Sequence, residues 1–206
     1  MDSEWSMDFA FPLLSLLRTN GSVEAAKNKA RSICYDNERL DGCLMACDDS
    51  SMKKIMRIGL QPWTQLCSRI DDLISQFDCW KTNVDVLSLG CHLESHHLRQ
   101  SMETFTHNHS TVILEQVCRN MNVMSICNIE EHNKFCGHTA KMLLVRLFRT
   151  SRKSFQEMLK LKWKELPEAC TEPIRYYAEE ESALSLGHSH QNGISAIIVI
   201  LALLLQ

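Results

Sequence analysis

Apolar side chains recur at intervals of three and four residues through the middle of the chain, and this spacing predicts amphipathic helices. The clearest stretch runs from Trp63 to Phe77, and Gln61-Pro62 before it suits a helix start, since proline is tolerated in the first turn. Strand-like alternation is hard to find. The pattern therefore predicts an all-α protein.

Similar spacing extends along the rest of the central region. We predict a break at Asn108 to Ser110, a connection at Asn128 to Lys134, and helices over residues 84–100, 111–124 and 139–161. The chain has only 7 glycines and 4 prolines, so few positions interrupt these helices. We expect a bundle of about five to six helices between residues 30 and 172.

Cysteine is unusually frequent, and an even number spread through the central region predicts a disulfide framework, which persists in oxidising compartments. Cys43 and Cys47 are four residues apart and so share one helix face. The alternatives are buried free thiols and a zinc site, although no C-x2-C pair is present. We expect disulfides at all ten positions: Cys34, Cys43, Cys47, Cys67, Cys79, Cys91, Cys118, Cys127, Cys136 and Cys170.

The C-terminal residues resemble a signal for a glycosylphosphatidylinositol (GPI) anchor. An apolar tail over residues 194–206 is shorter than the ~20 residues that span a bilayer, and a polar stalk and spacer over residues 173–193 precede it. Ser182 is the predicted attachment residue, with Ser185 second. A tail-anchored helix and a helix buried in the core are the alternatives. The prediction places the protein at the extracellular face of the plasma membrane.

Residues 1–25 are predicted as a signal peptide, with a short apolar core at Phe9 to Leu17. No positive charge precedes that core, so a true start further upstream is the alternative. Asn108 and Asn20 begin N-glycosylation triplets. Asn108 is the better candidate, because Asn20 would leave with the signal peptide.

Charge and composition exclude some functions. The formal net charge is -3, which argues against a dedicated nucleic-acid binder, and 45% hydrophobic content is ordinary for a globular protein. The basic stretch from Arg146 to Lys164 is interleaved with apolar residues, and we interpret it as a solvated helix face, with a heparin-binding or lipid-binding patch as the alternative.

Motifs for catalysis are missing. His92 and His96 lie one helical turn apart and could share a metal, but no H-E-x-x-H accompanies them, so an exposed histidine face is the preferred interpretation. No nucleophile elbow, P-loop or dinucleotide fingerprint is present. We expect no enzymatic activity, no cofactor and no metal site.

The cysteine ladder resembles a known family. Cys43-x3-Cys47, then Trp63-Thr-Gln-Leu-Cys67, Cys79, Cys91 and Leu114-Glu-Gln-Val-Cys118-Arg look like the chondroitin proteoglycan 4-like domain of nematode secreted proteins, or a related nematode cysteine-rich domain. The resemblance covers residues 34 to 170 and implies an extracellular helical module without enzymatic activity. Chondroitin attaches at Ser-Gly dipeptides, which this chain lacks.

These features predict a disulfide-rich, cell-surface-tethered module that acts in binding or in structure and has no catalytic activity. Its partner would be an extracellular protein or glycan, with the membrane reached through the C-terminal anchor and no nucleic acid involved. The alternative is an intracellular, tail-anchored helical adaptor.

Overall fold

A computed structural model describes residues 22–172 and 174, and every regular element in them is a helix. The predicted fold class, an all-α disulfide-rich domain, is confirmed. The helices are α3 (Val23–Met45), α4 (Ser51–Cys67), α5 (Ile70–Ser75), α6 (Phe77–Thr82), α7 (Val84–Gly90), α8 (His92–His107), α9 (Thr111–Leu159) and α10 (Glu168–Thr171).

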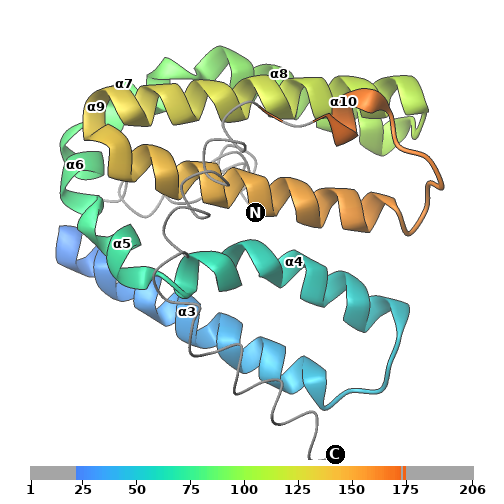
Figure 1. Cartoon of the computed structure of the whole chain (residues 1–206), viewed down its shortest axis with the longest axis horizontal. Helices are drawn as coiled ribbons and strands as arrows, with labels where there is room; N and C mark the ends of the chain where they lie inside the picture. Colours follow the sequence, from blue (N-terminus) through green and yellow to red (C-terminus); the bar gives the residue numbers. More distant parts are fainter. Residues whose placement is uncertain (1–21, 173, 175–206) are drawn as a thin grey trace, which may run out of the picture. The chain divides into compact units, whose positions relative to one another are not determined.

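The long helix α9 organises the domain. It reverses direction at Gly137, so that its two halves run side by side as an antiparallel pair (Figure 1). Helix α8 packs along the first half, where Asn120 donates a hydrogen bond to the carbonyl of His97 at 3.0 Å. Helix α4 packs along the second half, and α3 packs on α4.

The short helices α5 and α6 supply the centre of the core. Leu73, Phe77 and Trp80 are fully buried, and the ring centroids of Phe77 and Trp80 are 5.8 Å apart. These three residues follow helical spacing across the junction between α5 and α6. The Trp80 ring meets the buried ring of His132 in α9, and Ile129, Leu144 and Val145 of the same helix are also fully buried.

Four disulfides tie the helices together, and this number is typical of extracellular disulfide-rich domains. Three of them use cysteines of α9 at nine-residue intervals, which is roughly two and a half turns. Cys127 therefore faces away from Cys118 and Cys136. Its disulfide leaves α9 on the face opposite to the other two. The bridges are Cys34–Cys67, Cys79–Cys136, Cys91–Cys127 and Cys118–Cys170.

Several predicted helix limits change. Helix α4 begins at Ser51, where the Ser50 side chain accepts from the backbone N–H of Lys53 at 3.1 Å, so the start predicted at Pro62 is wrong and Pro62 lies inside the helix. The stretch to Phe77 is broken at Arg69, whose backbone angles (φ -135°, ψ 46°) are not helical. Hydrophobic spacing survives such a bend and cannot reveal it.

The connection predicted at Asn128 to Lys134 is also wrong, because this stretch is part of α9. Asn128 is buried and donates to the carbonyl of Met124 at 2.9 Å, so its polar group is satisfied within the helix. The break predicted at Asn108 to Ser110 is confirmed: α8 ends at His107 and α9 begins at Thr111.

Over residues 22–172 and 174, no helix combines the length and the apolar character that crossing a membrane requires. The predicted tail at 194–206, Ser182, Ser185 and Asn20 lie outside the described residues. Helix α3 begins at Val23, with Ser22 as its N-cap. Removal of the predicted signal peptide, residues 1–25, would therefore cut the first turn of this helix.

Candidate functional site: an apolar cavity

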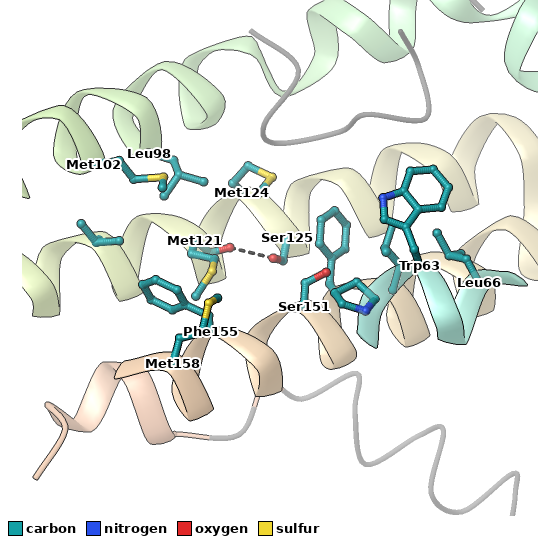
Figure 2. A pocket seen from close by; sticks show the side chains of 14 residues that line it. Trp63, Leu66, Leu98, Met102, Met121, Met124, Ser125, Ser151, Phe155 and Met158 are labelled. Carbon is teal, nitrogen blue, oxygen red and sulfur yellow. Dashed lines mark hydrogen bonds between the residues drawn. The ribbon is translucent and has the colours of Figure 1, made fainter. Parts of the chain in front are cut away.

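A cavity of about 330 Å³ lies between α4, α8 and the two halves of α9 (Figure 2). This volume is in the range of small-molecule binding sites, which is about 300–1,000 Å³. Helices separated in the chain build its walls. The lining residues are Pro62, Trp63, Leu66, Leu98, Met102, Val117, Met121, Met124, Ser125, Leu147, Phe148, Ser151, Phe155 and Met158.

The lining is almost wholly apolar. Ser125 and Ser151 are its only polar side chains, and no charged residue takes part. The Ser125 hydroxyl donates to the Met121 carbonyl at 2.7 Å, within its own helix (Figure 2). Its oxygen keeps lone pairs that can accept a hydrogen bond from a bound molecule. The cavity thus offers apolar contact with two weak polar points.

Four methionines line the cavity: Met102, Met121, Met124 and Met158. Methionine is unbranched and polarisable, so it adapts to ligands of different shape and is common at binding surfaces of broad specificity. Met121 and Met158 lie on opposite halves of α9 and point into the same space (Figure 2). This wall can therefore change shape without a change in the backbone.

The cavity is reachable from solvent. Among the lining residues, Leu66, Val117 and Met124 are buried, whereas Trp63 and Met102 are only partly buried. An enclosed void in a core would be lined by buried side chains throughout. The partial exposure of one part of the lining indicates an opening.

Polar bonds fix the α4 wall against the second half of α9. Gln61, just before Pro62, accepts from the Ser154 hydroxyl at 3.1 Å, and its amide donates to Glu157 at 3.4 Å. Ser154 is buried, so its bond with Gln61 satisfies a group that would otherwise be costly to desolvate. The separation of the two walls is thus set by specific contacts.

The prediction that all ten cysteines pair is wrong for two of them. Cys43 and Cys47 carry free, exposed thiols at the end of α3. Cys43 lies in the last turn of α3, but Cys47 lies beyond its end at Met45, so the prediction that the two share one helix face is wrong. The other eight cysteines pair among themselves.

Asn108 is exposed at the end of α8, in the connection that leads to α9. The Ser110 hydroxyl of the same triplet caps α9 by accepting from the backbone N–H of Ile113 at 3.3 Å. Helix capping therefore accounts for the serine independently of any glycan. Glycosylation at Asn108 stays a prediction.

The histidines do not form a site. His92, His96, His97, His107 and His109 are all exposed. Throughout the described part of the chain, no group of three or more histidine, cysteine or carboxylate side chains is arranged to hold a metal ion.

The solvated face predicted from Arg146 to Lys164 is wrong for Arg152. This residue is 4% exposed, and its guanidinium donates to Asn122 Oδ1 at 2.6 Å and to the Ala169 carbonyl at 3.1 Å. Alternation of basic and apolar residues could not distinguish this buried arginine from exposed lysines nearby.

Comparisons with known proteins add no identity: no family model, no curated protein and no solved structure matches this chain. The resemblance to nematode cysteine-rich domains therefore stays an expectation from the sequence.

Sequence reasoning did not find the cavity. Its lining comes from four helical segments, and each segment alone has the periodicity of an ordinary core face. The available signal was methionine, of which the chain has 10, with four on the faces that meet here.

Proposed function

We propose that this protein is an extracellular binding module, without catalytic activity, that holds a small apolar molecule in the cavity between α4, α8 and α9. The observation that carries the proposal is the lining itself, in which twelve of 14 side chains are apolar and none is charged. Burial of apolar surface contributes about 25 cal/mol per Å², so a ligand that fills the cavity gains affinity without any ion pair.

The charge-free lining favours a neutral ligand. An ionised carboxylate or ammonium inside the cavity would lose its hydration and find no opposite charge there. A ligand hydroxyl could instead donate to the Ser125 oxygen, and a hydroxyl or ester oxygen could accept from the Ser151 hydroxyl. The expected class is therefore a neutral lipid, a sterol or another apolar alcohol.

The disulfide framework supports an extracellular place of action for such a carrier. Four bridges within one helical domain resist unfolding where no chaperones operate, and disulfides persist in oxidising compartments. This ligand class differs from the protein or glycan partner expected from the sequence.

Displacement of a fluorescent apolar probe tests the proposal. The full chain should take up the probe, and a long-chain alcohol or a sterol should displace it more effectively than a fatty acid of equal length. Equal displacement by acid and alcohol would contradict the neutral-ligand proposal. Absence of probe uptake by the folded protein would contradict binding in the cavity.

A pair of methionine variants locates the site. Met121→Trp places a larger side chain in the cavity and should weaken probe binding at least tenfold. Met52→Trp makes the same change at a position of α4 that is 64% exposed and does not line the cavity, and it should leave binding unchanged. Circular dichroism of both variants checks that the fold persists.

We also propose that the module is held at the outer cell surface through residues 173–206. The support is the apolar tail and polar spacer of the sequence. Phosphatidylinositol-specific phospholipase C should release the protein from intact cells. A known GPI-anchored protein on the same cells is the control. If the enzyme releases the control completely and this protein stays on the cells, the proposed attachment is contradicted.

A further inference from the structure

The two unbridged cysteines stand apart from the rest of the framework. Eight of the ten cysteines pair within the chain, and the remaining thiols, Cys43 and Cys47, are both exposed at the end of α3. In a disulfide-rich extracellular protein, exposed thiols left over by the internal pairing suggest a bond to another molecule.

The turn that carries these thiols is held in place. Helix α3 ends at Met45, and the backbone N–H of Cys47 donates to the Leu44 carbonyl at 3.1 Å. Lys53 of α4 reaches back, and its ammonium donates to the Cys47 carbonyl at 2.7 Å and to Asp49 at 3.0 Å. Both thiols are therefore presented at a defined place on the surface.

A bridge between Cys43 and Cys47 themselves does not suit this geometry. Cys47 lies two residues beyond the end of α3, and its thiol is not bonded to that of Cys43. The Cys47 thiol instead lies 3.6 Å from the Cys43 carbonyl oxygen. An internal bridge would require the turn after Met45, in which the Cys47 N–H donates to the Leu44 carbonyl, to rearrange.

We infer that Cys43 and Cys47 form interchain disulfides with the same two cysteines of a second copy of this chain. A second copy brings two thiols at the same spacing, so a two-fold arrangement pairs all four and leaves none over. Leu40 and Met45 beside the thiols are 40% and 57% exposed, and they provide apolar surface for this contact. The inference does not depend on the cavity.

Bond formation needs an oxidant, and a disulfide-bearing oxidant of the secretory pathway serves. The Cys43 thiolate attacks one sulfur of that oxidant and releases its other sulfur as a thiol. A thiolate of the second copy then attacks the sulfur of Cys43 in the mixed disulfide and releases the oxidant's remaining thiol. Each interchain bridge thus oxidises two cysteines and reduces one oxidant disulfide to two thiols.

Peptide mapping tests the inference. The full chain is secreted, free thiols are blocked with an alkylating agent at harvest, and the protein is digested with trypsin without reduction. Because Arg39 and Lys53 flank them, both cysteines fall in one peptide, residues 40–53. The expected product is two copies of this peptide joined by disulfides.

Every other form of this peptide would overturn the inference. A single peptide with two alkyl groups means free thiols, and one lighter by two hydrogen atoms means an internal bridge. A peptide joined to glutathione or to another sequence means a different partner. Co-expression with a copy that carries a different epitope tag should yield a mixed dimer that reductant separates.

Variants distinguish a specific interface from random cross-linking. Cys43→Ser with Cys47→Ser should be monomeric on a non-reducing gel and should keep the circular dichroism spectrum of the wild type, because both side chains are exposed. Adding Ser32→Cys to this double variant places one exposed thiol elsewhere on α3. Dimer yield equal to that of the wild type from this control would overturn a specific contact.

Discussion

Gly137 lets α9 double back on itself. Its backbone angles are φ 79° and ψ -172°, a combination that is essentially restricted to glycine, and it is the sole residue with a positive φ in the described ranges. A Cβ added there would meet no atom within 4 Å, so the backbone conformation, and not space, requires glycine.

Gly137→Ala should therefore lower the free energy of unfolding by about 1–3 kcal/mol, the usual cost of a disallowed backbone conformation. Gly59→Ala is the matched control, because Gly59 lies in α4 with open space around its Cβ position. It should stabilise the protein by about 0.5–1 kcal/mol, since alanine favours helix. Denaturant titration measures both, and equal effects would contradict the assignment of the turn.

His132 is a buried base in the centre of the core. Its Nδ1–H donates to the Asn128 carbonyl at 2.8 Å, and its ring meets Trp80 edge to face with centroids 5.8 Å apart. Burial lowers the pKa of His132 from 6.5 to about 4, and the bond to Asn128 opposes this only in part. The folded state therefore keeps His132 neutral.

The unfolded chain takes up a proton at His132 below pH 6.5, while the folded protein does so only near pH 4. The stability that comes from keeping His132 neutral is thus fully present above pH 6.5. As the pH falls from 6.5 toward 4, the free energy of unfolding should drop by about 3 kcal/mol in total. His132→Gln should flatten this part of the stability curve. His96→Gln, at an exposed position, should leave its slope unchanged in the same denaturant titrations at stepwise pH.

At the scale of elements, the short helix α10 is docked on α9 by more than a disulfide. Arg152 donates to the carbonyls of Ala169 and Glu172, and the Gln156 amide donates to the carbonyl of Cys170. Apolar side chains close the same contact: Leu114, Leu159, Phe105, Trp163 and Leu166 pack around Cys118 and Cys170. Helix α10 is therefore held on α9 by hydrogen bonds to its backbone carbonyls as well as by the Cys118–Cys170 disulfide.

Arg152→Gln should destabilise the domain by about 1–3 kcal/mol, because buried carbonyls of the α10 region lose their donor. Lys153→Gln, the neighbouring exposed position, should change stability by less than about 0.5 kcal/mol. Thermal unfolding of the two variants compares them. A similar shift for both would mean that Arg152 acts through its charge alone.

The helical class and the disulfide framework could be predicted because they depend on local spacing and on cysteine number. The limits of single helices were less predictable. Ser50 caps α4 well upstream of Pro62, and buried Asn128 and His132 look like a polar connection until their bonds to the preceding turn are known. Tertiary contact decides such cases.

The candidate site was beyond prediction for a related reason. Trp63, Met102 and Met121 belong to segments whose neighbours in space depend on the reversal at Gly137. The hydrophobic spacing does not show that α9 reverses at Gly137, and not at the polar residues from Asn128 to Lys134. The free state of Cys43 and Cys47 likewise follows from the pairing of all the others.

At the scale of the whole domain, the disulfides divide the chain into two groups. Cys34–Cys67 closes the α3–α4 hairpin by itself, whereas the other three bridges overlap between Cys79 and Cys170. No bridge spans the stretch between Cys67 and Cys79. Every other position between Cys34 and Cys170 lies within a loop that at least one disulfide closes.

Two protease sites test this connectivity. A site inserted between Ser68 and Arg69 should, after cleavage and denaturation without reductant, give two separate fragments. A site inserted in the connection at Asn108 to Ser110 should give one band until reductant is added. Any other outcome in the double cysteine variant, which lacks Cys43 and Cys47, would contradict the pairing.

The cavity lies between these two groups, which are joined by the backbone and by no disulfide. Pro62, Trp63 and Leu66 stand on the hairpin side, and the methionine-rich remainder of the lining stands on the interlocked side. No disulfide joins the hairpin to the second half of α9, so noncovalent contacts, among them the bond from Ser154 to Gln61, hold this wall of the cavity. A guest that fills the cavity adds contacts between α4 and α9, and amide exchange in α4 should therefore slow when the cavity is filled.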